Sequence, residues 1–353
     1  MRTRTTRVGG RDVARVAGVS INTVSLVVKD SPLVAPETKA RVRAVIERLD
    51  YRPHAAAAAL ASARSQTLGY VVSRGYDAVV GESYATIDVF HNQLLNAITN
   101  QAQTHDRYVL LDAFVDARRC LSLLNSGRID GAVVDLTVGD DVLRYLVAQG
   151  APVVLVGRDA GDLPVSWVKA DEEDGAYEAI HHLLALGHRR PALLTVVEES
   201  NSAIVEERTH GYVRALAEAD LTLATTDVVQ GDYTFASGVE RGRELLGRDP
   251  RPTAIFAMSE IMASGVLQAA QALGLCVPED LSIVTTENSP LVEYVRPRLS
   301  AVHVPMYQVG ARATDMLIAL IDDPTQAPRQ LVLPTTFVDR ESCAPPPAPM
   351  STS

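Results

Sequence analysis

The chain has 353 residues, 47% of them hydrophobic, which is enough for two or three domains with sizeable cores. Its net charge of −10 argues against a protein that meets nucleic acid over its whole surface. No apolar run reaches the roughly 18 residues of a membrane span, and residues 1–10 lack the apolar stretch of a secretory signal. Cys120, Cys276 and Cys343 form no Cys-x-x-Cys pair, so we expect a cytoplasmic protein without a structural zinc site.

The charge is distributed unevenly along the chain. Residues 1–64 hold 12 Lys and Arg against 5 Asp and Glu, a net charge of +7, which leaves −17 for the remainder. A basic head on an acidic body suggests that only the head meets a polyanion. A solvated basic tail would carry the same charge.

The N-terminal part of the chain predicts a small all-α domain. Residues 1–10 show no hydrophobic periodicity, and we expect them to form a disordered arm. The spacing of apolar residues over 11–53 predicts three short helices. Gly18 ends the first, Ser20 can cap the second, and Pro36 opens the third.

The first two predicted helices are joined by a tight turn at Gly18, which is the geometry of a helix-turn-helix. The start of the second helix in such a motif enters the major groove. Asn22 can pair with adenine through two hydrogen bonds, and Ile21 and Leu26 can contact thymine methyl groups. The alternative to a helix-turn-helix is an ordinary helical hairpin, in which the apolar residues have the same spacing. The remaining polar residues suit phosphate contacts, so the predicted DNA-contacting set is Ser20, Ile21, Asn22, Thr23, Ser25, Leu26 and Lys29.

An alanine-rich segment, HAAAAALASAR, occupies residues 54–64. It has high helix propensity but almost no apolar bulk to anchor it. A short helix of this kind is marginal in isolation. We therefore predict a hinge helix that orders when a partner binds it.

Residues 65–343 alternate short apolar runs with amphipathic segments. This βαβα rhythm predicts parallel sheets covered by helices on both faces. The length exceeds one comfortable core, so we expect two lobes. The Pro-rich residues 344–353 are expected to be disordered. Predicted strands are 68–72, 108–112, 131–136, 152–157, 192–197, 254–258 and 281–285, and predicted helices include 89–104, 173–186, 203–219 and 261–273.

Two sets of residues carry a family resemblance. The head contributes Asp12, Val13, Ala14, Ala17, Gly18, Val19, Ser20, Thr23, Val24, Ser25, Val34, Thr38, Arg41, Val42, Leu49, Tyr51 and Pro53. The body contributes residues 153–158, 167–171, 182–191, 299–302, 333–334 and 340–343, together with Arg208 and Gly211. In this order and spacing they resemble the lactose/galactose repressor family of bacterial regulators, over nearly the whole chain.

The resemblance gives the hinge a function. It implies that the hinge helices of a dimer enter the minor groove of the operator, where a leucine from each wedges between base steps. The matching leucine is Leu60, and His54 and Ala57 complete the predicted hinge contacts. The hinge lacks an arginine that many family members carry, and Leu26 replaces another. The preferred operator is therefore expected to differ from that of relatives.

For the body, the resemblance implies two Rossmann-like lobes with a ligand between them, as in periplasmic sugar-binding proteins. Ligands of open α/β sheets lie beyond the carboxyl ends of the strands. Arginines and carboxylates can hold sugar hydroxyls, and Phe90 can stack on a sugar. Trp167 is a further candidate, or a packing residue. The ligand-binding residues implied by the resemblance are Asp88, Phe90, Arg158, Arg208, Glu260 and Glu287.

Three of these ligand segments depart from the family's usual pattern. Ser259-Glu260 stands where Asn-Asp is usual, residues 284–288 replace Val-Gly-Phe/Tyr-Asp-Asp, and residues 88–91 replace Asn-Pro-Phe-Phe. A carbohydrate is the leading ligand class. A polar ligand of another class, or a site without a ligand, is the alternative.

Enzyme motifs are weak in this sequence. No Gly-x-Gly-x-x-Gly follows the first predicted strand, and neither a Walker loop nor a Gly-x-Ser-x-Gly elbow is present. His181, His182 and His188 lack a set of Cys, His or carboxylate partners, so we expect no metal site. The paired acids Glu172 and Glu173 are interpreted as a solvated face. We expect neither catalytic residues nor a cofactor.

These observations predict a sequence-specific DNA-binding transcription regulator, by default a repressor, that dimerises mainly through its first lobe. Each head reads half of a roughly palindromic, double-stranded operator, and a small ligand changes operator affinity by altering the angle between the lobes. The alternative is a solute-binding protein or small-molecule enzyme with an incidental basic N-terminus. The complete helix-turn-helix argues against that alternative.

Overall fold

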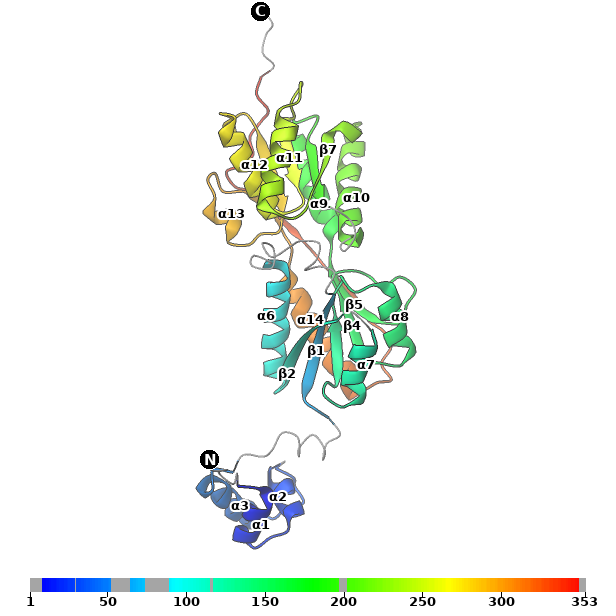
Figure 1. The fold of residues 1–353 in the computed structure, drawn as a ribbon, viewed down its shortest axis with the longest axis vertical. Coiled ribbons are helices and arrows are strands. Elements are labelled where there is room, and N and C mark those ends of the chain that lie inside the picture. The colour runs from blue at the N-terminus through cyan, green and yellow to red at the C-terminus, as the bar shows by residue number, and fades with distance from the viewer. Residues whose placement is uncertain are drawn as a thin grey trace, which may run out of the picture. The chain divides into compact units, whose positions relative to one another are not determined.

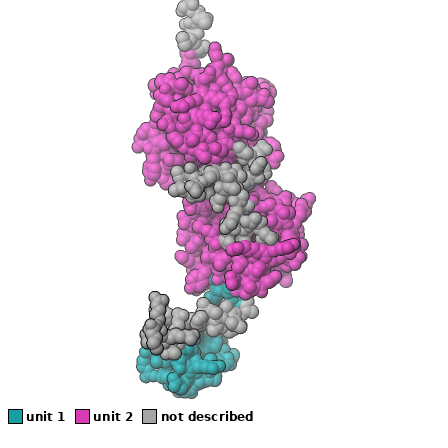
Figure 2. All heavy atoms as spheres, viewed as in Figure 1, with its two compact units in different colours: residues 1–66 teal, residues 67–353 magenta. Residues whose placement is uncertain are grey.

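The computed structural model describes residues 8–28, 30–51, 64–73, 89–114, 117–196 and 202–348. The chain divides into two compact units, residues 1–66 and 67–353 (Figure 2). The smaller unit is helical, and the larger contains two six-stranded sheets (Figure 1). No helix in the described part of the chain is long and apolar enough to cross a membrane.

Three helices build the smaller unit: α1 (Gly10–Ala17), α2 (Ile21–Val28) and α3 (Pro36–Arg48). Their apolar faces meet in one small core. Gly18 follows α1 with a φ of 64°, a left-handed conformation that ends the helix without a steric penalty. The buried apolar residues of this core are Val13, Ala14, Ala17, Val24, Val27, Val34, Val42 and Val45.

The first sheet of the larger unit is parallel throughout, with strand order β11-β5-β4-β3-β1-β2. Its alternating side chains face two separate cores. Val133 and Val154 pack in the core that includes α6 and α14, whereas Ala132 and Val153 pack in the core that includes α7 and α8. The elements of this lobe are β1 (Thr67–Ser73), α6 (Val89–Thr104), β2 (Tyr108–Phe114), α7 (Ala117–Asn125), β3 (Gly131–Val134), α8 (Asp140–Ala148), β4 (Val153–Val156), β5 (Ser166–Ala170), α14 (Met306–Asp322) and β11 (Gln330–Leu333).

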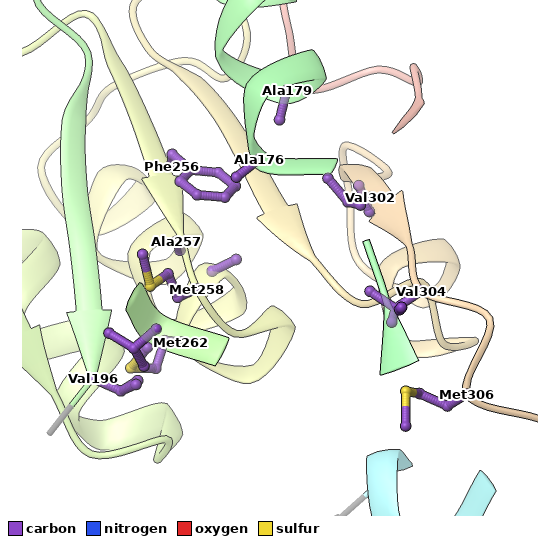
Figure 3. Packing of buried hydrophobic residues seen from close by; sticks show 14 of the residues in the cluster. Ala176, Ala179, Val196, Phe256, Ala257, Met258, Met262, Val302, Val304 and Met306 are labelled. Carbon is purple, nitrogen blue, oxygen red and sulfur yellow. The ribbon is translucent and has the colours of Figure 1, made fainter. Parts of the chain in front are cut away.

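The second sheet has the order β12-β10-β9-β8-β6-β7, and only β12 runs antiparallel to its neighbour. Figure 3 shows Phe256 beside Ala176 in its core, with Val196, Met258 and Met262 grouped nearby. The elements of this lobe are α9 (Glu172–Ala185), β6 (Ala192–Val196), α10 (Ser202–Glu218), the 3-10 helix η1 (Thr225–Asp227), β7 (Val228–Gly231), α11 (Phe235–Leu246), β8 (Ala254–Ala257), α12 (Glu260–Ala272), β9 (Ser282–Thr286), α13 (Leu291–Tyr294), β10 (Ser300–His303) and β12 (Thr336–Val338).

The chain passes between the two sheets at three points: from β5 to α9, from β10 to α14, and from β11 to β12. The first and third passages are joined by hydrogen bonds. The Asp171 backbone N–H donates to the Leu333 carbonyl at 2.9 Å, and the Thr335 hydroxyl donates to the Asp171 carbonyl at 3.0 Å. Two of the three passages between the lobes are therefore hydrogen-bonded to each other and are not independent linkers.

The predicted fold class is confirmed: an all-α head and a two-lobed α/β body. Apart from the hinge helix, each predicted strand and helix matches an observed one to within a few residues at its ends. The sequence did not predict β5, β7, β10, β11 or β12 as strands. Most of these are short, and β11 and β12 lie at sheet edges with half-exposed side chains.

Both predicted disordered ends need correction at their inner boundaries. Gly10 is already the first residue of α1. Ala344 is held in place, because its N–H donates to the Ser282 hydroxyl at 3.0 Å and its carbonyl accepts from that hydroxyl at 3.0 Å. The predicted hinge over residues 54–63 lies outside the described residues.

Replacing Gly211 with alanine should destabilise the second lobe. A Cβ at this position would lie 2.0 Å from the Glu173 carbonyl oxygen, which is backbone and cannot move alone. We expect Gly211→Ala to lower the free energy of unfolding by about 1–3 kcal/mol or more, the cost of overpacking. Urea unfolding followed by circular dichroism measures this.

The exposed neighbour His210 on the same helix provides the control for that substitution. His210→Ala should change the free energy of unfolding by less than about 0.5 kcal/mol. Equal stability of Gly211→Ala and the unaltered chain would show that α9 and α10 do not approach as closely as described.

Candidate DNA-reading head and ligand site

The predicted DNA-contacting residues fall into two groups around α2. Ile21 and Asn22 are exposed, and Ile21 has 55% of its surface accessible. Ser20 and Thr23 bond to each other: the Thr23 N–H donates to the Ser20 hydroxyl at 3.0 Å, and their two hydroxyl oxygens lie 2.9 Å apart. Ser20 thus caps α2, while Ile21 and Asn22 project at the start of the helix.

The later residues of α2 are less accessible. Ser25 and Leu26 are half-buried, and Leu26 packs against the core of the head. The predicted contacts Lys29, His54, Ala57 and Leu60 lie outside the described residues. Among the residues described, Ile21 and Asn22 are therefore the most available for contact with a base edge.

An acidic residue after α2 links it to α3. The Asp30 carboxylate accepts hydrogen bonds from Lys39 at 2.9 Å and Arg43 at 2.6 Å. Lys39, and to a lesser degree Arg43, lowers the pKa of this exposed carboxyl. Sequence analysis did not single out these two cations, because nothing in their local spacing distinguishes them from an ordinary charged helix face.

In the first lobe, a buried carboxylate follows strand β3. Asp135 is fully buried and accepts hydrogen bonds from the Tyr70 hydroxyl at 2.9 Å and the Thr137 N–H at 3.0 Å. His91 Nε2 lies 3.4 Å from Oδ1 of Asp135, which is the oxygen that also accepts the Thr137 N–H. Burial opposes ionisation, but His91 and Thr137 outweigh it and lower the pKa of Asp135. The signal that could have revealed it was an acidic residue inside the apolar run predicted as the strand 131–136.

Arg158 follows strand β4, at the same carboxyl edge of the first sheet. Its guanidinium donates to the carbonyls of Leu136 at 3.3 Å and Val138 at 3.0 Å. It also pairs with Asp140 at 2.8 Å. These partners hold the loop after β3, so a substantial part of the hydrogen-bonding capacity of Arg158 is directed at its own lobe.

In the second lobe, Arg208 lies fully inside the protein. Its Nε donates to Glu172 at 2.8 Å, and its Nη1 donates to the Met258 carbonyl at 3.1 Å. Burial opposes the charged form, but Glu172 outweighs it and raises the pKa of Arg208, with smaller contributions from Glu287 and Tyr233. The prediction of a solvated Glu172 is wrong, because the arginine it pairs with comes from a different helix.

Glu260 begins helix α12 and is only 1% exposed. Its carboxylate accepts hydrogen bonds from the Ser289 N–H, at 3.0 Å, and from the Ser289 hydroxyl. Burial raises the pKa of Glu260 in spite of both bonds. The side chain therefore anchors the loop after β9, and this loop includes Glu287, whose φ is 68°.

One ion pair spans the two lobes. Lys169 on β5 binds the Glu207 carboxylate on α10, and lies 3.9 Å from Asp159. Burial raises the pKa of Glu207, while Lys169 opposes that shift. Because Glu207 precedes Arg208, this pair places the edge of the first lobe next to the buried arginine of the second.

The structure thus brings some of the predicted ligand residues together and separates others. Arg208 and Glu287 are close enough to interact electrostatically, and Arg158 lies on the other lobe. Trp167 is 8% exposed and packs in the core between the first sheet and α7 and α8. Asp88 and the Phe90 side chain lie outside what the structure describes.

Two family models match parts of this chain. Residues 11–54 match the model of bacterial regulatory proteins of the lacI family, and residues 180–343 match a periplasmic binding protein-like domain. Catabolite control protein A of Priestia megaterium is 34% identical over 338 residues, which cover 94% of this chain and 98% of that protein. The chain belongs to the lacI family of bacterial regulatory proteins.

Solved structures of this family share its architecture. The transcriptional regulator CelR–cellobiose complex is 30% identical, with a TM-score of 0.69 over 95% of this chain and 100% of that one. The lac repressor dimer bound to operator and the anti-inducer ONPF is 25% identical, with a TM-score of 0.82 over 96% and 100%. This lacI-family chain is a DNA-binding transcription regulator and not an enzyme.

Truncating Arg208 should strongly destabilise the regulator. Arg208→Ala leaves the buried Glu172 carboxylate without its charge partner, a loss that typically costs about 3–5 kcal/mol. Arg214 on the same helix is the matched control, because it pairs with the exposed acids Glu173 and Asp174. Arg214→Ala should cost about 1 kcal/mol or less. Urea unfolding compares the two, and equal losses would contradict the buried role of Arg208.

Proposed function

We propose that this chain represses transcription by binding a palindromic operator as a dimer, and that a small ligand controls this binding. The ligand class that we propose is a sugar. The observation that carries the proposal is that one chain combines two features. The exposed Ile21 and Asn22 begin the second helix of a helix-turn-helix, and the buried polar group around Arg208 lies at the carboxyl ends of parallel strands.

The head supports the DNA-binding part of the proposal. A side-chain amide such as that of Asn22 matches the donor and acceptor of adenine in the major groove, and Ile21 suits a thymine methyl group. The net charge of +7 over residues 1–64 provides the attraction to phosphates. The related lac repressor was solved as a dimer bound to its operator.

The body supports a ligand between the lobes. Arg208 uses Nε and Nη1 for its protein partners, so Nη2 makes no hydrogen bond to a residue that the structure describes. The Glu287 carboxylate is close enough to Arg208 to contribute to its raised pKa. A guanidinium and a carboxylate together suit a ligand with several hydroxyls, and the related CelR was solved with cellobiose.

The remaining parts of the proposal concern organisation. We assign DNA reading to residues 11–53, the operator-dependent hinge to 54–64, and ligand binding and dimerisation to 65–343. The function of the chain on DNA and its similarity to DNA-binding regulators favour a cytoplasmic location. Leu60 is the proposed minor-groove wedge.

Selection from random double-stranded DNA with the full chain tests the DNA-binding part. We expect a roughly palindromic consensus sequence. Asn22→Ala should weaken discrimination at one base pair of each half-site by about 1–3 kcal/mol, because a bidentate contact is lost. Glu47→Ala, on the exposed face of α3, should leave that preference unchanged. Failure to select any sequence, or an unchanged preference in Asn22→Ala, would count against the proposed reading residues.

A thermal-shift screen with cellobiose and other mono- and oligosaccharides tests the ligand. A bound sugar stabilises the fold by mass action, by about 2.7 kcal/mol at a concentration a hundred times the Kd. The shift should disappear in Glu287→Gln and in Arg208→Ala and persist in the control Glu173→Gln, whose side chain is half-exposed. A shift retained in both site variants would contradict the proposed site. A shift with a non-sugar ligand alone would overturn the sugar assignment.

A further inference from the structure

Three side chains with metal-binding atoms meet in the second lobe, away from the proposed ligand site. His182 lies on α9, and Asp339 and Cys343 follow β12 near the end of the described chain. One potential ligand atom from each lies within 4.8 Å of the other two. His182 Nε2 and Asp339 Oδ1 are 3.5 Å apart.

The imidazole of His182 supplies an independent sign that a partner belongs here. Its Nε2 is buried and makes no hydrogen bond with any residue that the structure describes. A buried nitrogen without a hydrogen bond is unfavourable, because it has lost its contact with water. The ring is also held in place by Phe337, whose centroid lies 4.8 Å away at an interplanar angle of 42°. A fixed ring whose buried Nε2 makes no hydrogen bond with a described residue and faces a carboxylate oxygen at 3.5 Å is suited to a metal ion.

The geometry and charge of the group fit a divalent ion of intermediate softness. Zn²⁺ binds nitrogen and oxygen at about 2.0–2.2 Å and thiolate sulfur at about 2.3 Å, usually as a tetrahedron. Two tetrahedral ligands at those lengths lie roughly 3.3–3.7 Å apart, which includes the 3.5 Å separation of His182 Nε2 and Asp339 Oδ1. A thiolate and a carboxylate together carry the two negative charges that neutralise the ion.

We propose that His182, Asp339 and Cys343 form a Zn²⁺ site in which the fourth position is open to water. The side chain of Asp339 is 55% exposed, so the ion can enter from solvent on that side. The other two ligands are more enclosed, which favours retention of the ion once it is bound.

Neighbouring groups prepare the ligands. The Ser300 hydroxyl donates to Asp339 Oδ1 at 3.0 Å and accepts from the Arg340 N–H at 2.8 Å. Such outer contacts orient a carboxylate toward a metal ion. Burial raises the pKa of the Cys343 thiol to about 11. The thiol therefore carries its proton before an ion binds. Binding replaces the sulfur–hydrogen bond with a sulfur–zinc bond and releases that proton to solvent.

The site would clamp helix α9 to the C-terminal segment of the chain. His182 belongs to a histidine-containing stretch whose sequence neighbours offer no set of metal-binding partners. The structure supplies those partners from residues far along the chain, where no local spacing could reveal them.

Cobalt provides a direct probe of a cysteine ligand. The full chain, without a polyhistidine tag and stripped of metal, is titrated with Co²⁺ and then with Zn²⁺. We expect one Co²⁺ per chain with a near-ultraviolet thiolate-to-cobalt absorption band, displaced by Zn²⁺, and a higher unfolding temperature with Zn²⁺. The exposed Cys276 provides the matched control: Cys276→Ser should retain both effects, whereas Cys343→Ser should lose the band.

The other two ligands are tested in the same way. His182→Gln and Asp339→Asn should keep the cysteine but weaken Co²⁺ binding by about tenfold or more. His182→Gln decides the proposal if Cys343→Ser does not fold, as judged by its circular dichroism spectrum. Absence of Co²⁺ and Zn²⁺ binding by the unaltered chain, a band that survives in Cys343→Ser, or binding unaffected by His182→Gln would overturn it.

Discussion

The second lobe depends on one buried ion pair, between Arg208 on α10 and Glu172 at the start of α9. Both side chains are 3% exposed, so neither charge can exchange its partner for water, and each requires the other. The first turn of α9 is also a favourable place for a carboxylate, because unsatisfied backbone N–H groups point toward it. The pair thus fixes how the two helices are placed along each other.

That constraint explains a second feature of the same helices. Gly211 lies about one turn after Arg208 on α10, and any side chain there would meet the Glu173 carbonyl. Close contact of the two backbones at Gly211 and pairing of the two charges describe the same helix–helix geometry. The Arg-x-x-Gly pattern in the sequence therefore encodes packing as well as a candidate ligand contact.

The position of this pair also relates the candidate ligand site to the connection between the lobes. Asp171 immediately precedes Glu172 and bonds to Leu333 and Thr335 of a second passage between the lobes. Glu207, immediately before Arg208, binds Lys169 of the first lobe. A ligand that binds Arg208 would therefore act on an ion pair in which each residue adjoins an inter-lobe connection: Glu207 precedes Arg208, and Asp171 precedes Glu172. A differential contact of this kind is what a ligand needs in order to change the angle between lobes.

How far the sequence could predict this molecule depended on whether the determinants were local. Central strands such as β3 and β4 are buried on both faces, so they form continuous apolar runs that the sequence displays directly. Strand β5 includes the half-buried Ser166 and Lys169 among its buried residues, so its apolar signal is weaker. The proposed DNA-reading surface is likewise local, since Ser20 caps the helix from which Ile21 and Asn22 project. Polar sites in the body are assembled from distant segments. Glu172 resembles a solvated acid in the sequence, whereas in the structure Arg208 from another helix lies beside it.

Glu260 shows a second limit of the sequence. Its position matches a ligand residue of the family, while its carboxylate is bonded to Ser289. The family position predicted a carboxylate directed at a ligand, whereas the observed hydrogen bonds direct it to Ser289, in a loop that begins after another strand.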